Sequence, residues 1–323
     1  MDVLSDLLNS VHISGSVLFH AEFGDPFAYG SPNSEQYASM LVPQARRLMI
    51  FHLVLEGTCL ARCAEGATVE VQAGDIIMLP RGDALVLADD QNTPTVPIFT
   101  CLPPFPWTAA PDLRLGGEGP RTRLICGFLY ADEAILQTLT NDLPPLLVLD
   151  THSVLPRIRA MRDYVLDELR AGRPGGASLV NRLAEILFVE VLRHALTEGE
   201  HTTLRAALRD PVVGRALRAV HDDPARAWTI EEMARAAASS RSLLAERFHG
   251  LVGCPPIEYL TRWRMQLAAR RLSEGRDSIA TVAEDVGYRS EAAFNRAFRR
   301  HLGETPAAWR RQRRQAAESA PNG

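Results

Sequence analysis

Two short segments near the carboxyl end of this 323-residue chain carry polar side chains at the spacing of one helix face. They are Arg241, Ser242, Ala245 and Glu246 in the first segment, and Glu291, Ala292, Asn295 and Arg296 in the second. An arginine can bind guanine, an asparagine can bind adenine, and a glutamate can accept from the amino group of cytosine. We therefore expect these eight positions to face the major groove of DNA. For any single residue, the alternative is an ordinary solvated helix face.

Both segments belong to an internal repeat that fills the last third of the chain. The residues Phe248, Gly253, Pro256 and Tyr259 recur fifty positions later as Phe298, Gly303, Pro306 and Trp309. A repeat of this length is one supersecondary unit built twice. Each copy has the pattern of a short helix, a tight turn and a second helix, which is the arrangement that places a helix in a major groove.

Helix-end signals position the second helix of each copy. Ser240 and Ser290 stand at the N-cap positions and are also candidate phosphate contacts. Residues 229–232 have the pattern of a capping box that starts the first helix. At the turn, Gly287 can adopt a positive φ without steric cost, and its counterpart Ala238 is less suited to it. The side chains predicted to face inward are Leu244, Phe248, Phe294 and Phe298.

A continuous helix is predicted over residues 256–272, between the two copies. About 17 residues with a rise of 1.5 Å each span roughly 25 Å. A spacer of this size could hold the two reading helices near one turn of DNA apart, about 34 Å. The arginines available for phosphates are Arg262, Arg264, Arg270, Arg271, Arg299 and Arg300, some of which could instead pair with acidic side chains.

The charge is distributed unevenly. Residues 1–209 hold 16 Arg against 25 Asp and Glu, a net charge of −9, whereas residues 210–323 hold 19 Arg against 14 Asp and Glu, a net charge of +5. The basic excess lies on the repeated segment, as phosphate neutralisation requires.

The composition is that of a globular protein of two domains, with 46% hydrophobic and 23% charged residues. No apolar run approaches the roughly 18 residues of a membrane span, and the acidic N-terminus lacks the basic start of a signal peptide. The five cysteines, an odd number, fit a reducing cytosol. We expect a cytoplasmic protein with no membrane partner.

The N-terminal half has the pattern of short strands separated by turns. Apolar runs at 50–55, 68–71 and 76–79 alternate with Gly57, Gly66, Gly74 and Gly82. Such spacing predicts an antiparallel sandwich or barrel. The proline-rich residues 91–120 are expected to form a long surface loop, followed by a returning strand at 122–130.

Two helices are predicted next, at about 154–170 and 179–196, because apolar residues recur there every three or four positions. The apolar stripe of the second helix fits either packing against the barrel or a dimer seam, and the sequence leaves both open. The polar residues 198–203 then favour a domain boundary.

Three stretches resemble the AraC/XylS family of bacterial transcription regulators. They are residues 228–234 (WTIEEMA), 259–265 (YLTRWRM) and 286–294 (VGYRSEAAF). The resemblance covers about 210–311 and implies two helix-turn-helix units joined by a linker helix, with base-reading helices at 240–249 and 290–300. It also implies promoter DNA and RNA polymerase as partners. Ser239 stands where the family usually has an apolar turn residue, and Ala245 offers no hydrogen bond to a base, so we expect the first unit to discriminate less.

The N-terminal half is similar to the cupin-type sensor domains of one AraC subgroup. The likeness rests on residues 51–57 (FHLVLEG), 74–82, 126–127 and 143–147 (LPPLL). It implies sensing of a small-molecule or chemical-stress effector, and dimerisation.

A metal-dependent cupin enzyme needs a histidine cluster with a carboxylate. His52 is a weak candidate ligand and His20 is the only other one nearby, since Leu85 stands where related sequences often have histidine. Cys59 and Cys63 should share one strand face, where small apolar filling is favoured over thiol sensing. Since no nucleophile motif or phosphate-binding loop is present, we expect no enzyme activity, no cofactor and no metal.

The sequence thus predicts an α+β multidomain transcription regulator that binds specific DNA, with a homodimer as one candidate assembly that the sequence leaves open. The alternatives are a metal-dependent cupin enzyme fused to a DNA-binding domain, and a non-specific architectural DNA binder. The expected organisation is a cupin-like antiparallel β-barrel with two helices at 1–197, a linker at 198–209, an all-α DNA-binding domain at 210–311 and a disordered basic tail at 312–323.

Overall fold

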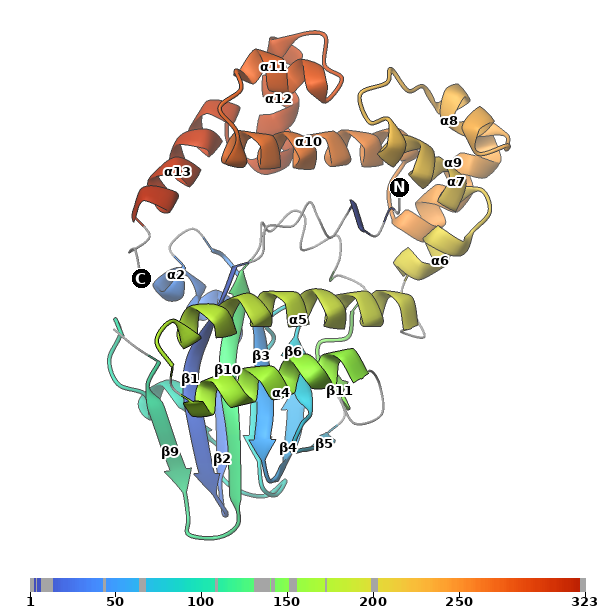
Figure 1. Ribbon diagram of the computed structural model, residues 1–323. Coiled ribbons are helices and arrows are strands. Elements are labelled where there is room, and N and C mark those ends of the chain that lie inside the picture. Colours follow the sequence, from blue (N-terminus) through green and yellow to red (C-terminus); the bar gives the residue numbers. More distant parts are fainter. Residues whose placement is uncertain are drawn as a thin grey trace. The chain divides into compact units, whose positions relative to one another are not determined.

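The computed structural model of the chain describes residues 3, 5–6, 14–42, 45–63, 68–107, 110–130, 140, 143–150, 156–171, 173–198 and 203–319 (Figure 1). The chain divides into two units. The N-terminal unit contains residues 13–195, and the C-terminal unit contains residues 196–323 together with residues 1–12. Within the described ranges, no helix is both long and apolar enough to cross a membrane.

The N-terminal unit contains two β-sheets. The larger sheet has six strands in the order β11-β6-β3-β10-β1-β9, and the smaller has five in the order β5-β4-β7-β2-β8. The strands are β1 (Ser14–Gly24), β2 (Ala28–Ser31), β3 (Met49–Glu56), β4 (Thr58–Cys63), β5 (Val69–Gln72), β6 (Ile76–Leu79), β7 (Leu85–Ala88), β8 (Val96–Pro97), β9 (Asp112–Gly116), β10 (Arg121–Tyr130) and β11 (Leu147–Leu149). Short helices are η1 (Ser34–Gln36), α2 (Ala38–Leu41) and η2 (Ile98–Thr100).

The predicted α+β class with a β-rich N-terminal half is confirmed, and three details of the prediction are corrected. The described sheets are hydrogen-bonded separately rather than closed into one barrel. Their edge strands are not antiparallel throughout, because β9 pairs with β1 and β8 pairs with β2 in parallel. A long connection allows a parallel return. Residues 91–120 are also not one continuous loop, since they contain β8, η2 and β9.

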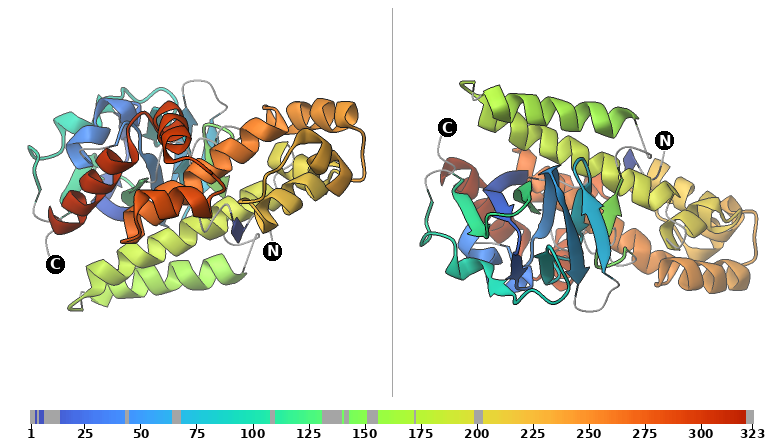
Figure 2. Two further views of the ribbon diagram at one scale, coloured as in Figure 1. Left: turned by 90° about the horizontal axis from the view of Figure 1, so that it is seen from above. Right: turned by 90° about the horizontal axis from the view of Figure 1, so that it is seen from below.

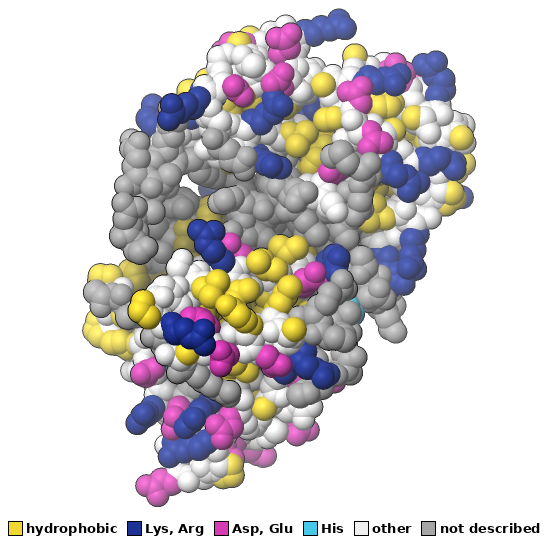
Figure 3. All heavy atoms as spheres, viewed as in Figure 1, with side chains coloured by type: hydrophobic (Ala, Val, Ile, Leu, Met, Phe, Trp, Pro, Cys, Tyr) yellow, Lys and Arg dark blue, Asp and Glu magenta, His cyan; other side chains and the backbone are white. Residues whose placement is uncertain are grey.

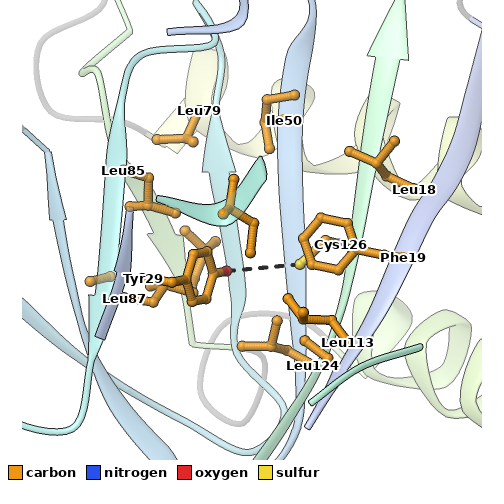
Figure 4. Packing of buried hydrophobic residues seen from close by; sticks show 14 of the residues in the cluster. Leu18, Phe19, Tyr29, Ile50, Leu79, Leu85, Leu87, Leu113, Leu124 and Cys126 are labelled. Atoms are coloured by element: carbon orange, nitrogen blue, oxygen red, sulfur yellow. Dashed lines mark hydrogen bonds between the residues drawn. The ribbon is translucent and has the colours of Figure 1, made fainter. Parts of the chain in front are cut away.

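The core of the N-terminal unit lies between the inner faces of the two sheets. Phe23 of β1 and Tyr29 of β2 come from opposite sheets, and their ring centroids are 4.8 Å apart. The fully buried Tyr29 hydroxyl lies 3.9 Å from Sγ of Cys126 on β10, as Figure 4 shows among the surrounding leucines. All four residues of β6 are buried, which is typical of a strand covered on both faces.

Helices α4 (Pro156–Ala171) and α5 (Gly176–Glu198) lie side by side over the outer face of the six-stranded sheet (Figures 1 and 2). The Asn181 side chain of α5 accepts a hydrogen bond from the backbone N–H of Val17 on β1, at 3.3 Å. On the apolar stripe of α5, Leu187 and Val191 are buried, whereas Ile186 is 49% exposed. The stripe therefore packs within the N-terminal unit only in part.

The C-terminal unit is helical, and its repeat is visible in the element lengths. α8 and α11 have 7 residues each, and α9 and α12 have 12 residues each. The helices are α6 (Thr203–Arg209), α7 (Val213–Asp222), α8 (Ile230–Ala236), α9 (Arg241–Val252), α10 (Pro256–Glu274), α11 (Ile279–Asp285), α12 (Glu291–Leu302) and α13 (Pro306–Ser319). We call α8 and α9 with their turn the first motif, and α11 and α12 with theirs the second motif.

Two segments at the ends of this unit are helical. Part of the predicted linker 198–209 is helical, because α6 consists mostly of leucine, arginine and alanine, which favour helices. The predicted disordered tail at 312–323 is likewise helical as far as Ser319, the end of α13. This tail sequence is also rich in alanine and arginine.

Candidate nucleic-acid interface

Reciprocal hydrogen bonds start the first motif. The Thr229 hydroxyl accepts from the backbone N–H of Glu232 at 3.2 Å, and the Glu232 carboxylate accepts from the backbone N–H of Thr229 at 2.9 Å. Helix α9 begins after Ser240, whose hydroxyl accepts from the backbone N–H of Leu243 at 3.2 Å. The predicted capping box and the predicted Ser240 cap are both confirmed.

The second motif repeats these signals. Ser278 caps α11 and Ser290 caps α12, each by accepting a hydrogen bond from a backbone N–H in the first turn. At the opposite ends, α9 and α12 stop at Gly253 and Gly303, whose φ angles of 77° and 82° are left-handed. Equivalent signals at equivalent positions produce two copies of one local structure.

The inner faces of α9 and α12 are fixed by buried apolar side chains. On α9 these are Leu244 and Phe248, and on α12 they are Phe294 and Phe298, none more than 1% exposed. The Phe298 ring packs edge-on against Trp309, with the centroids 5.8 Å apart. Since one face of each helix is held in the core, the opposite face must point outward.

The predicted reading residues occupy that outward face. On α9, Arg241, Ser242, Ala245 and Glu246 are all exposed. On α12, Glu291, Ala292 and Arg296 are exposed, whereas Asn295 is half-buried. The structure thus confirms which side of each helix faces solvent, and contact of these residues with DNA remains a prediction.

Arg241 is already engaged within the first motif. Its Nη1 lies 2.6 Å from Oε1 of Glu231 on α8, and both side chains are exposed. The pKa of Glu231 is lowered first by a hydrogen bond from the backbone N–H of Glu231 itself and then by the Arg241 guanidinium. An exposed ion pair of this kind contributes little stability, so Arg241 can exchange Glu231 for DNA at small cost.

The arginines expected to contact phosphates separate into two groups. Arg262 pairs with Glu258 and Arg271 pairs with Asp285, so acidic partners already hold these two. Arg299 and Arg300 are exposed at the C-terminal end of α12. Another of the expected phosphate contacts, Arg264, donates to two backbone carbonyl groups. This corrects the expectation that it is available for DNA.

The core beneath the first motif contains a buried histidine that sequence patterns did not indicate. The His221 ring stacks on Trp263, with centroids 4.3 Å apart, and its Nε2 lies 2.8 Å from the Tyr259 hydroxyl. Burial lowers the pKa of His221 to about 4, although Asp222 acts in the opposite direction. Oδ2 of Asp6 lies 3.4 Å from Nδ1, and the lowered pKa favours the neutral form of His221.

Comparison with known proteins agrees with this geometry. A helix-turn-helix domain family matches residues 233–312, and a cupin family matches residues 2–197. A putative AraC-like transcription regulator of Streptomyces lividans is 33% identical over 96% of this chain and 97% of its own length. The chain belongs to the AraC-like transcription regulators.

Further relatives have the same printed role. A putative AraC-like regulator of Streptomyces antibioticus is 32% identical, covering 96% of this chain and 97% of its own. The HTH-type transcriptional regulator AlkR of Acinetobacter baylyi is 28% identical, covering 97% of this chain and all of its own. The prediction of a DNA-binding transcription regulator with a cupin-type N-terminal domain is confirmed. The relatives' names support a regulator rather than an enzyme.

The N-terminal unit of the regulator encloses a mainly apolar cavity between its two sheets. The polar groups of its lining include His52 and Ser31, and within the described residues neither Nε2 of His52 nor Oγ of Ser31 has a hydrogen-bond partner. The enclosed space is about 20 Å³, which holds about one water molecule. The cavity is lined by Leu18, Phe19, Tyr29, Ser31, Tyr37, Ile50, His52, Ile98, Phe99, Leu102 and Cys126.

The surroundings of His52 fit a structural histidine better than a metal ligand. Its Nδ1 lies 2.8 Å from Sγ of Cys126, the cross-strand neighbour, and burial lowers the pKa of His52 to about 3. His20 is on the other face of the six-stranded sheet, where its Nδ1 lies 3.2 Å from Asp112. In the part of the chain that the structure describes, no three His, Cys, Asp or Glu side chains gather as a metal site requires.

The cysteines of the regulator are free thiols. Cys59 and Cys63 are both buried on β4, as strand alternation predicted. Burial, and secondarily Asp25, raise the pKa of Cys59 to about 12, and burial with Asp83 raises the pKa of Cys63 to about 11. Thiols with raised pKa values are poor nucleophiles, which favours the filling role over redox sensing.

Proposed function

We propose that this regulator inserts α9 and α12 into two successive major-groove segments on one face of promoter DNA. The observation that carries this proposal is the mounting of two equal motifs on one continuous helix. α10 has 19 residues, or roughly 28 Å at 1.5 Å per residue, close to the turn of about 34 Å that separates such segments.

Each group of exposed residues has a role in this arrangement. The eight outward positions on α9 and α12 read base edges, and Arg296 and Glu246 supply the strongest donor and acceptor. Ser240, Ser290, Arg299 and Arg300 contact phosphates at the ends of the two helices. Ala245 contributes only apolar contact, so the second motif discriminates more between sequences than the first.

Selection from random DNA with the full chain, followed by footprinting of the selected site, tests this proposal. We expect two protected segments on one face of the duplex, and loss of protection on a scrambled sequence of equal composition. Uniform protection of any DNA would instead favour the architectural binder. The experiment therefore separates these two functions.

We infer that the effector occupies the cavity between the sheets and is a small, uncharged, mostly apolar molecule. Among the described residues, no charged side chain lines the cavity, and the lowered pKa of His52 favours its neutral form, so a charged ligand would lose its hydration without compensation. One oxygen of the ligand would bond His52 Nε2 or Ser31 Oγ. Because the space is small, Phe99, which is 40% exposed, and Leu102 must move aside to admit it.

Thermal unfolding with chosen probes tests this chemistry. 1-Hexanol should raise the Tm of the full chain more than hexanoate does at equal concentration. The variant Leu102→Trp, which fills the cavity, should abolish the hexanol effect. Equal stabilisation by hexanoate would contradict an uncharged site. Stoichiometric iron, zinc or manganese in the purified protein would favour the metal-dependent enzyme.

Effector binding would act on DNA by a population shift between two conformations of the regulator, changing its engagement with DNA or RNA polymerase. Thermodynamic linkage then requires that DNA alters effector affinity by the same factor as effector alters DNA affinity. Titration calorimetry with and without the selected DNA measures both. Equal effector affinities in the two titrations would remove the allosteric proposal.

A homodimer through α4 and α5 is part of this proposal. Figure 3 shows apolar side chains gathered on the face of the N-terminal unit where these helices lie. Tyr164 and Ile186 are 50% and 49% exposed, and Leu179 is 36% exposed. Ile186→Glu should shift the full chain from dimer to monomer in analytical ultracentrifugation, and an unchanged mass would contradict this interface.

A further inference from the structure

Helix α10 alone connects the two motifs end to end, and a single helix can bend and lets its ends twist relative to each other. A second attachment beside the helix is needed to fix their orientation. We propose that Arg264, with Gly287 and Tyr288, is a brace that fixes the relative orientation of the two motifs and thereby sets the base-pair spacing of the DNA site. This inference rests on the proposed grip of two successive grooves.

The first half of the brace joins α10 to the loop before α8. Nε of Arg264 donates to the carbonyl oxygen of Pro224 at 2.7 Å, and Nη2 donates to the carbonyl oxygen of Arg226 at 2.7 Å. A planar guanidinium fork holds two acceptors in fixed geometry better than an ammonium group does. Arg264 is half-buried and is committed to these carbonyl groups.

This loop is held together by contacts of its own side chains, so that it can transmit orientation. The indole N–H of Trp228 donates to the carbonyl oxygen of Asp223 at 2.8 Å, closing the loop. The Arg226 guanidinium lies over the Trp228 ring, 4.5 Å from its centroid, and also reaches Glu232 of α8. The loop that accepts the Arg264 hydrogen bonds is therefore connected to α8, so these bonds hold α10 to the first motif.

The second half of the brace reaches the turn of the second motif. The Arg264 guanidinium carbon lies 5.8 Å from the Tyr288 ring centroid, and the Tyr288 ring packs edge-on against buried Phe294 of α12. Beside it, a Cβ added to Gly287 would lie 2.4 Å from the carbonyl oxygen of Ala225 and 2.7 Å from Nη2 of Arg264. The turn of one motif therefore packs directly on the loop of the other, with no room for a side chain.

The consequence for DNA is geometric. One inserted base pair separates two groove segments by a further 3.4 Å or so and turns one relative to the other by about 35°. Braced motifs cannot follow this change, whereas motifs joined by α10 alone can follow it in part. The brace therefore adds a preference for one spacing of the two DNA segments to the preference for their sequence.

The test uses the full chain and a site selected from random DNA. One base pair is inserted or deleted between the two segments of the site that the motifs contact, which we call its two boxes. The wild type should lose about tenfold or more in affinity on either change. Arg264→Met should reduce that loss to about threefold or less, with base preferences inside each box unchanged. Arg299→Met is the matched control because it removes the same charge from an expected phosphate contact. It should weaken binding at all three spacings by one factor.

Tyr288→Leu provides a second variant that keeps both carbonyl bonds of Arg264 and should relax the spacing preference in the same direction. If circular dichroism shows that Arg264→Met does not fold, the spacing series with Tyr288→Leu decides. If the selected site has two boxes and the folded variants lose as much affinity on changed spacing as the wild type does, the brace is overturned and the two-groove grip stands. Selection of a site with a single box would overturn the two-groove grip as well.

Discussion

Ala238 and Gly287 occupy equivalent turns of the two motifs, and both have a left-handed backbone, with φ angles of 48° and 85°. In this conformation a Cβ costs about 1–2 kcal/mol. Glycine has no such cost but loses more freedom on folding, by about 0.5–1 kcal/mol. The first motif therefore folds with a strained residue where the second has the favourable one.

Ala238→Gly should accordingly raise the free energy of unfolding of the C-terminal unit by up to about 1 kcal/mol. The reverse change, Gly287→Ala, should lower it by more than that, because the new Cβ also meets the carbonyl oxygen of Ala225. Urea unfolding of both variants measures the two effects. A destabilised Ala238→Gly variant would show that the turn is not strained.

Arg296→Ala should relax base preference at one position of the selected site, with a loss of about 1–3 kcal/mol for the preferred base. The reason is that Arg296 is exposed on the outward face of α12. Arg299→Ala is the comparison, since a phosphate contact weakens all sequences alike. If Arg296→Ala also weakens every sequence equally, Arg296 contacts only phosphate.

Stability of the N-terminal unit should depend on the protonation of His52. Burial lowers its pKa to about 3, whereas an unfolded histidine titrates near 6.5. The unfolded chain takes up the proton first as the pH falls, so the contribution is complete above about pH 6.5 and is lost between there and about pH 3. The size is on the order of a few kcal/mol.

Urea unfolding across this pH range checks the prediction. His52→Phe should flatten the dependence, because it removes the buried imidazole. A wild-type profile that stays flat between these pH values would mean that His52 is solvated or charged in the fold.

Thiol labelling distinguishes the filling role of the cysteines from a sensing role. Cys101 is half-buried, whereas Cys59 and Cys63 are buried and have raised pKa values. Iodoacetamide should therefore modify Cys101 of the folded chain well before the other two, as mass spectrometry would show. Rapid modification of Cys59 would revive the redox alternative.

The C-terminal unit was predictable from sequence because its signals are local. A helix cap or a turn residue acts within a few positions of itself, as Ser240, Ser290 and Gly287 do. The repeat also contains each of these signals twice. Long-range pairing has no such local sign. Nothing around Gly24 or Gly116 indicates that β1 and β9 pair in parallel.

The same distinction applies to the candidate site. Helical spacing identified the outward face of α12, but the partial burial of Asn295 depends on neighbours that spacing does not specify. Arg264 is the clearest example. Its type suggested a phosphate contact, and only the fold brings the carbonyl groups of Pro224 and Arg226 to it.

The most direct test of the whole account is hydroxyl-radical footprinting of the full chain on its selected site, with each motif altered separately. We predict two protected segments about one helical turn, roughly 10 base pairs, apart on one face of the duplex. Arg241→Ala should weaken one segment, and Arg296→Ala should weaken the other. A single protected segment, or the same change from both variants, would contradict the central claim that two motifs on one braced helix grip consecutive grooves.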